Sequence, residues 1–179
     1  MHLFWSDERC LPRNHEQSNF RIAYDELISC IWIPYENIHR IIGELSPWEA
    51  AGYYEAEMKK HFREDLPAFD LMMLGVGSDG HTASLFPGSE ALKEKQRLSL
   101  PVFSHTALHW RVTLTLPVLN AARQVLFLVS GRSKAGIVGS LIGRKESKGY
   151  PAAMVKPSAG NITWLLDRDA ASELPEALS

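Results

Sequence analysis

The feature that most constrains the fold is an apolar run, Phe69 to Val76, that leads directly into a glycine-rich loop. The run has the length and character of a buried strand. Three glycines within six residues then interrupt it, at positions 75, 77 and 80. Ser78, Asp79 and His81 place a hydroxyl, a carboxylate and an imidazole on the same loop. Because ligands of open α/β sheets bind at the carboxyl ends of strands, we expect the chemical centre here.

The loop also has the spacing G-x-G-x-x-G that is typical of dinucleotide-binding folds. That fingerprint requires an acidic residue ~20 positions further on, which binds a ribose hydroxyl. The corresponding region, residues 98–102, contains no acid, and Pro87-Gly88 shortens the helix that we expect to begin near Thr82. A purely structural turn explains the glycines but not the ionisable groups between them. The pattern therefore favours a functional loop that does not bind NAD.

Composition predicts one soluble globular domain over residues 1–179, because the chain is 45% hydrophobic and 22% charged. A net charge of −2 gives no sign of a nucleic-acid partner. The sequence contains no targeting segment and no apolar run of membrane-spanning length, so no membrane partner is expected. Cys10 and Cys30 form neither a disulfide framework nor a metal-ligand spacing, which favours a reducing cytoplasm. The oligomeric state stays open.

Hydrophobic periodicity predicts strands near residues 3, 40, 72, 113, 127 and 164, most of them separated by helices. The helices are an amphipathic segment over 20–31, one with a capping box over 47–62, and shorter ones at 117–122 and 135–142. This alternation predicts an α/β fold, a doubly wound and mainly parallel sheet with helices on both faces. We expect residues 88–110 to be mostly loop, with His105 and His109 on the surface rather than binding metal.

Residues 75–88 read Gly-Val-Gly-Ser-Asp-Gly-His-Thr-Ala-Ser-Leu-Phe-Pro-Gly and resemble the signature of the 6-phosphogluconolactonases. Related glucosamine-6-phosphate deaminases share the Gly-x-Gly-x-Asp-Gly-His core but continue with Ile-Ala-Phe-Asn-Glu-Pro, where this chain has Thr82 to Pro87. Residues 5–9, 111–117 and 130–134 are similar to further segments of the lactonases. The resemblance runs from about Phe4 to Leu174 and implies a Rossmann-like sugar-phosphate fold.

The resemblance implies hydrolysis of 6-phospho-D-glucono-1,5-lactone to 6-phosphogluconate in the oxidative pentose phosphate pathway. His81 is the expected general base, since imidazole changes its protonation near neutral pH. Asp79 is expected to orient His81 or to help place the attacking water. No metal or organic cofactor is implied. Substrate contacts are expected from oxyanion donors and from cations that bind the phosphate: Arg9, Gly77, Ser78, Gly80, Arg111 and Lys134.

Other interpretations of these residues stay open. Residues alone favour Arg9 as a surface arginine paired with Asp7 or Glu8, and they also permit Lys134 as an exposed basic turn. Lactonases carry a Gly-Gly-Ser-Thr-Pro phosphate loop before the part that this chain matches, so we expect the chain to be N-terminally truncated, with an exposed sheet edge. The alternatives are an amino-sugar phosphate deaminase or isomerase, and an inactive truncated domain that binds sugar phosphates.

Overall fold

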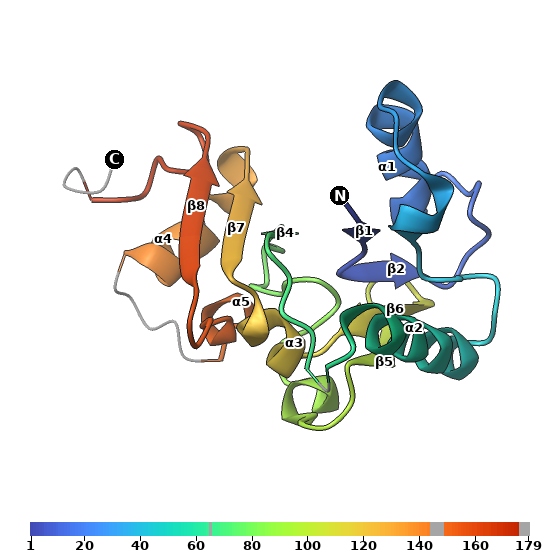
Figure 1. Ribbon diagram of the computed structural model, residues 1–179. Helices are drawn as coiled ribbons and strands as arrows, with labels where there is room; N and C mark the ends of the chain where they lie inside the picture. Colours follow the sequence, from blue (N-terminus) through green and yellow to red (C-terminus); the bar gives the residue numbers. More distant parts are fainter. Residues whose placement is uncertain (65, 144–148, 176–179) are drawn as a thin grey trace. The chain divides into compact units, whose positions relative to one another are not determined.

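Strands and helices alternate along the chain in the computed structural model, which describes residues 1–64, 66–143 and 149–175 (Figure 1). The chain divides into two units, the first formed by residues 1–65 and 97–114 and the second by residues 66–96 and 115–179. Each unit combines strands with helices, and the predicted α/β class is confirmed. Parallel and antiparallel sheets both occur, whereas the sequence predicted one mainly parallel sheet.

Two small sheets build the first unit. Strand β1 (Leu3–Phe4) pairs in parallel with β3 (Ile38–His39). The second sheet is antiparallel and has the order β2 (Asp7–Arg9), β6 (His109–Leu114), β5 (Ser99–Ser104). The strand expected near residue 113 therefore does not belong to a parallel sheet.

Strand β5 lies in a region that the sequence predicted to be loop. Its pattern includes Pro101, which lacks an N–H group and argues against a central strand. In the structure β5 pairs only with β6 among the described strands, so that it is an edge strand, where proline is tolerated. Edge position thus reconciles Pro101 with strand structure.

Of the helices predicted for the first unit, one is found with the predicted bounds and the other is shorter than predicted. Helix α2 (Pro47–Phe62) begins with the predicted capping box between Ser46 and Glu49. Helix α1 spans only Asn19–Glu26, and short 3-10 helices follow at Ile28–Cys30 (η1) and Tyr35–Asn37 (η2). No residue of α1 is buried, and Ile28, in η1, is the residue of the apolar stripe predicted over 20–31 that lies in the core.

Tyr54 of α2 connects this helix to the segment between β1 and β2. Its side chain is buried, and its hydroxyl both donates to the carbonyl oxygen of Trp5 (2.9 Å) and accepts from the Trp5 N–H (2.8 Å). Burial raises the pKa of the Tyr54 hydroxyl, which therefore stays protonated and able to donate. One side chain thus satisfies both backbone groups of a buried residue.

Replacing Tyr54 with phenylalanine tests this connection. We expect Tyr54→Phe to lower the free energy of unfolding by about 2–4 kcal/mol, because two buried backbone groups lose their partner. Chemical denaturation measures the change. Tyr53→Phe is the matched control, since Tyr53 is 56% exposed, and it should change stability by less than about 0.5 kcal/mol. Equal effects of the two substitutions would contradict the assigned role.

The second unit contains a parallel sheet of β4 (Met72–Leu74), β7 (Gln124–Val129) and β8 (Asn161–Leu166), in that order (Figure 1). Phe127 at the centre of β7 is fully buried, and its ring stacks on Trp164 of β8 at 4.2 Å. The α-helices of this unit are α3 (Leu116–Ala121), α4 (Ala135–Ile142) and α5 (Pro151–Met154), with 3-10 helices η3 (Glu90–Lys93) and η4 (Arg132–Lys134).

One local expectation for this unit is wrong. No helix begins near Thr82; residues 82–85 form a tight turn in which Thr82 and Leu85 make an antiparallel bridge. Apolar side chains of this sheet that are exposed include Met73 (58%), Leu128 (50%) and Leu165 (55%). Alternate residues of each strand point to opposite faces, which explains why Leu74 and Phe127 are nevertheless buried.

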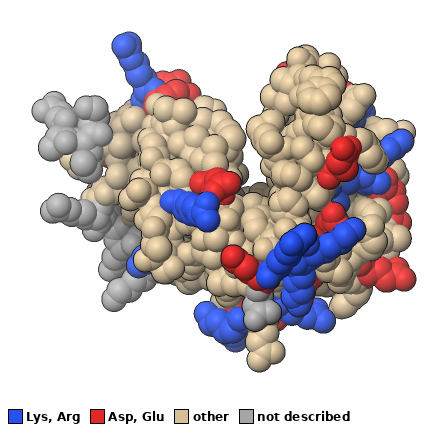
Figure 2. All heavy atoms as spheres, viewed as in Figure 1, with Lys and Arg blue, Asp and Glu red and all other residues tan. Residues whose placement is uncertain are grey.

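The surface and the helices agree with the chain's composition. On the described part of the face in Figure 2, acidic and basic side chains are interspersed over a mostly uncharged surface. None of the described helices combines the length and the hydropathy needed to cross a lipid bilayer.

Candidate active site

The glycine loop after β4 is closed by its own hydrogen bonds. The Gly77 N–H donates to the His81 carbonyl oxygen (2.8 Å), and the Gly80 N–H donates to the Gly77 carbonyl oxygen (2.9 Å). The Thr82 hydroxyl donates to the Gly75 carbonyl oxygen (2.9 Å), which connects the end of the loop to its beginning. The loop is therefore a closed turn at the carboxyl end of a parallel strand. Gly77 and Gly80, expected as oxyanion donors, use their amides within the loop instead.

Asp79 and His81 form a hydrogen-bonded pair within this turn. Asp79 Oδ1 lies 2.6 Å from His81 Nδ1 and also accepts the backbone N–H of His81 (3.1 Å). The side chains are 52% and 30% exposed, so solvent reaches both. A carboxylate at this distance favours the tautomer with its proton on Nδ1. The lone pair of His81 is then on Nε2, where it can accept a proton.

The charge of Asp79 supports this tautomer. Partial burial alone would raise the pKa of its carboxyl group, but the backbone and ring hydrogen bonds from His81, and the charge of a protonated His81 ring, lower it below its usual range. Asp79 is therefore a carboxylate at neutral pH. The stabilisation from this lowered pKa is present above the unfolded-state value and is lost as the pH falls through the folded-state value.

Two glycines of the loop are required because a larger residue at either position would overlap neighbouring side chains. A Cβ atom at Gly77 would lie 2.1 Å from His81 Nδ1 and 2.6 Å from Asp79 Oδ1. A Cβ atom at Gly80 would lie 2.4 Å from Cδ1 of Tyr150, and Gly80 has a φ of +80°. The Gly80 carbonyl oxygen accepts the N–H of Ala152 (3.0 Å). The missing Cβ atom of Gly77 thus leaves space for the side chains of Asp79 and His81, and that of Gly80 leaves space for the ring of Tyr150.

The basic turn after β7 lies beside this loop. Lys134 Nζ is 3.5 Å from Ser78 Oγ, so a cation and a hydroxyl of two sequence-distant loops meet. Both expected site residues belong to the second unit.

The amide of that turn is already occupied by a carboxylate. The Gly131 N–H donates to both oxygens of Asp167 (2.9 and 3.1 Å), and Asp167 Oδ1 also accepts the N–H of Ala170 (2.7 Å). The sequence predicted Lys134 of this turn as a phosphate contact but did not identify Asp167 as the partner of the Gly131 amide. An incoming anion therefore has Lys134 rather than the Gly131 amide as its contact at this turn.

The two arginines of the expected site are cross-strand partners in the first unit. Arg9 of β2 pairs with Arg111 of β6 in the antiparallel register. Arg111 Nη1 lies 3.8 Å from Asp7 Oδ2, and both side chains are nearly buried, at 13% and 12% exposure. Burial, with the charge of Arg9, lowers the pKa of Arg111, while Asp7 and Glu8 act in the opposite direction. The register thus concentrates two positive charges at one position of the sheet.

The expected alternative, an ion pair between Arg9 and Asp7 or Glu8, is not among the ion pairs of the described residues. Arg9 Nη1 instead donates to the Gln17 carbonyl oxygen. Its Nε atom is buried and has no hydrogen-bond partner within the part of the chain that the structure describes. Because a buried N–H without a partner costs free energy, Arg9 retains capacity for a further acceptor.

Glu8 holds this strand against helix α1, a role that the sequence analysis missed. Its buried carboxylate accepts the hydroxyl of Ser18 (3.0 Å) and the backbone N–H groups of Asn19 (2.8 Å) and Phe20 (2.7 Å). An anion at a helix N-terminus is favourable, because the first amides have no partner within the helix. Ser18 also accepts the N–H of Arg21, as expected for a capping residue.

The second unit, taken by itself, has the features of an α/β enzyme that acts on a small anionic ligand. It is an α/β unit that presents a carboxylate–imidazole pair, a hydroxyl and a lysine on loops at the carboxyl ends of parallel strands. Such a set suits acid–base chemistry on a small anionic ligand. The chain belongs to the glucosamine-6-phosphate isomerase/6-phosphogluconolactonase family, whose family model matches residues 1–164.

Individual relatives agree with this assignment. Human 6-phosphogluconolactonase is 41% identical over 171 residues, a match that covers 94% of this chain and 66% of the human protein. The solved structure of a protein named devB is 38% identical with a TM-score of 0.90, over 97% of this chain and 74% of that one. A 6-phosphogluconolactonase from Thermotoga maritima has 32% identity and a TM-score of 0.80, over 93% and 72%. The predicted resemblance is confirmed, and the chain spans 66% of the length of its human relative.

The steric requirement for glycine at position 77 can be tested without an activity assay. We expect Gly77→Ala to displace the His81 ring from Asp79, because the added Cβ would overlap both side chains. The ¹⁵N chemical shifts of the His81 ring report which nitrogen carries the proton. They should show the Nδ1–H tautomer in the unmodified chain and lose that preference in the variant. Gly75→Ala is the matched control, since a Cβ there meets no atom within 4 Å. An unchanged tautomer in Gly77→Ala would refute the steric argument.

Proposed function

We propose that this chain hydrolyses 6-phospho-D-glucono-1,5-lactone to 6-phosphogluconate, a step of the oxidative pentose phosphate pathway. The observation that carries the proposal is the 2.6 Å pair of Asp79 and His81 on the closed glycine loop. Membership of the family and 41% identity to a human 6-phosphogluconolactonase support the choice of substrate. The substrate is an anionic sugar lactone, and neither a nucleic acid nor a membrane is a partner in this proposal.

The reaction begins with His81 as general base. Its Nε2 accepts a proton from a water molecule as the water oxygen attacks the lactone carbonyl carbon, C1. Asp79 holds the Nδ1–H and stabilises the imidazolium that forms, since its carboxylate is ionised at neutral pH. The C1–O5 bond then breaks, and His81 returns the proton to the departing O5. The carboxylic acid product ionises in solution, so every proton is accounted for.

The negative charge that develops on the carbonyl oxygen requires nearby donors. Gly77 and Gly80 donate within the loop, so we assign them to shaping the turn rather than to binding the oxyanion. Ser78 is the loop residue that we assign to the substrate, because its hydroxyl lies beside Lys134. Arg9, with its buried Nε, is assigned to the developing charge or to another anionic group of the substrate.

We assign the phosphate group to Lys134, and Arg111 to an anionic group of the substrate. Lys134 is positioned at the glycine loop, and an ammonium group binds phosphate as a compact charge. Arg111 and Arg9 repel one another in the first unit, and an anion relieves this repulsion. Binding the phosphate away from the reacting carbon orients C1 relative to the water.

Hydrolysis of the phosphorylated lactone tests the acid–base pair. The lactone opens spontaneously, so rates are measured above buffer. We expect His81→Ala to lower kcat/KM by about 10²–10⁴-fold, because general base catalysis is lost, and Asp79→Asn to lower kcat through the wrong ring tautomer. His105→Ala, in the turn after β5, is the matched histidine control and should retain the full rate. An unchanged rate in folded His81→Ala would overturn the general-base assignment.

The phosphate assignment has its own test. We expect Lys134→Met to raise KM for the phosphorylated lactone by about 10- to 100-fold, the effect of losing one charge-assisted contact, with a smaller change in kcat. Unphosphorylated glucono-1,5-lactone should be hydrolysed equally by the variant and the unmodified chain. Arg111→Met is compared in the same assay. The assignment fails if both lactones respond equally to loss of Lys134.

The family also includes glucosamine-6-phosphate isomerases, which keeps that activity as the second candidate. Release of ammonia from glucosamine-6-phosphate by the same preparation distinguishes it from lactone hydrolysis. A folded chain that shows neither activity would instead be a sugar-phosphate-binding domain without catalysis. Ligand-induced stabilisation by 6-phosphogluconate detects that outcome.

We propose further that residues 1–179 act as one catalytic domain in a reducing cytoplasm. Cys10 and Cys30 are free thiols in the structure. Burial, with the nearby charge of Glu8, raises the pKa of the Cys10 thiol to about 11, which disfavours the reactive thiolate. Three plant relatives are named as chloroplastic, so the cytoplasmic location stays a prediction.

A further inference from the structure

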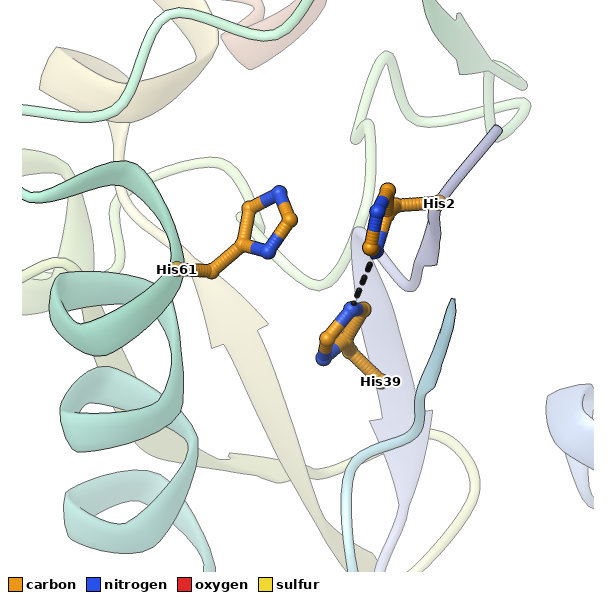
Figure 3. A group of neighbouring side chains, drawn as sticks. All are labelled: His2, His39 and His61. Carbon is orange, nitrogen blue, oxygen red and sulfur yellow. Dashed lines mark hydrogen bonds between the residues drawn. The ribbon is translucent and has the colours of Figure 1, made fainter. Parts of the chain in front are cut away.

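Three histidines of the first unit lie together, and none of them is among the residues assigned to the lactone. His2 precedes β1, His39 ends β3, and His61 lies in the last turn of α2. One ring nitrogen of each lies within 4.8 Å of the others. Figure 3 shows His61 extending from its helix toward His2 and His39, which are joined by a 2.9 Å contact between Nδ1 of His2 and Nε2 of His39.

Strand pairing and aromatic packing determine this arrangement. The parallel pairing of β1 with β3 sets Phe4 opposite His39, and the two rings stack at 4.1 Å with an interplanar angle of 10°. The ring of Phe4 also lies 5.2 Å from that of His61. Phe4 thus packs against the rings of His39 and His61 without offering them a side-chain hydrogen bond.

A carboxylate orients the most buried member of the cluster. Glu57 Oε1 lies 2.8 Å from His39 Nδ1, and Glu57 precedes His61 by one turn of α2. A carboxylate in this position keeps the proton on Nδ1, so the lone pair of His39 is on Nε2, facing His2. Metal-binding histidines commonly have such a carboxylate on the other ring nitrogen, where it fixes the ring and raises its basicity.

Charge and distance suit a small cation. Neutral imidazole is the form that binds metals, and each of the three rings offers one nitrogen to the cluster. Zinc–nitrogen bonds of 2.0–2.1 Å place tetrahedral ligand atoms about 3.3–3.4 Å apart. The nitrogens here range from the 2.9 Å contact up to 4.8 Å, so small side-chain rotations suffice. His2 is exposed, which leaves it room to move.

We propose that His2, His39 and His61 bind one divalent transition-metal ion, with Zn²⁺ the favoured ion and water as the fourth ligand. Imidazole ligands suit zinc, whereas magnesium and calcium require oxygen ligands that this cluster does not supply. On binding, the ion replaces the hydrogen bond between His2 and His39. If His2 coordinates through Nδ1, its proton transfers to Nε2 by exchange with water. The ion joins β1, β3 and α2, so its expected effect is to stabilise the first unit.

Zinc binding to the full chain, prepared without a polyhistidine tag and stripped of metal by a chelator, tests the proposal. Calorimetry should give one Zn²⁺ per chain. Zinc at 100 times its Kd should raise Tm by about 5–10 °C, because binding to the folded state alone stabilises it. His2→Ala and His61→Gln should each weaken binding more than tenfold. Glu57→Gln should weaken it about 10- to 100-fold, as expected for the carboxylate behind a ligand.

Two controls separate this cluster from other histidines. His105→Ala removes an exposed histidine of the same unit, and His81→Ala removes the ring of the Asp79 pair; both should retain the zinc affinity. No zinc bound by the unmodified chain, or an affinity that is unchanged by loss of both His2 and His61, would overturn the proposal and leave the rings as an aromatic stack. Because binding is the readout, this outcome is independent of whether the chain hydrolyses lactones.

Discussion

Parallel pairing of β4 with β7 is the constraint on which the proposed chemistry depends. The register places Leu74 opposite Phe127, both buried, so burial of these side chains resists a shift of one residue. Parallel strands deliver the loops that follow them to the same edge of a sheet. Ser78 and Lys134, which are 56 residues apart in sequence, therefore approach to 3.5 Å. Packing of apolar side chains thus decides which polar groups meet.

Within the loop, the short hydrogen bond between Asp79 and His81 depends on the absence of a side chain at Gly77. Asp79 and His81 come within 2.6 Å only because Gly77 has no Cβ atom to occupy the same space. The closed turn uses the amides of Gly77 and Gly80 for its own hydrogen bonds. The glycines therefore shape the acid–base pair, and the ligand-binding contribution of the loop rests on its side chains.

In the first unit, two like charges lie opposite each other in the antiparallel sheet. Arg9 and Arg111 are cross-strand partners, an arrangement that is unfavourable unless neighbouring charges offset it. Asp7 and Glu8 provide that offset, and Glu8 also accepts two amides at the start of α1. In the same unit, Glu57 and Phe4 hold a histidine cluster that has no part in the proposed hydrolysis. In this unit carboxylates position both the arginine side chains and an imidazole.

The sequence by itself determined the α/β class, the family and the nature of the glycine loop, because these depend on local order: an apolar run, closely spaced glycines, and ionisable residues between them. It also predicted α2 correctly, since the capping box and the buried Tyr54 lie on one segment. It did not predict β5, because Pro101 argues locally against a strand and only its edge position permits one. Nor did it find Asp167 at Gly131, 36 residues away.

Only the tertiary structure decided which distant groups become neighbours. The cross-strand register set Arg9 against Arg111, and strand pairing with helix packing brought His2, His39 and His61 together. No sequence spacing signals either arrangement, because the histidines come from three separate segments of the chain and have no metal-ligand motif. A sequence motif reveals a function only where the residues that perform it are close together in the sequence. The remaining contacts arise from the burial of apolar side chains and the pairing of backbone groups, which act across the whole folded chain.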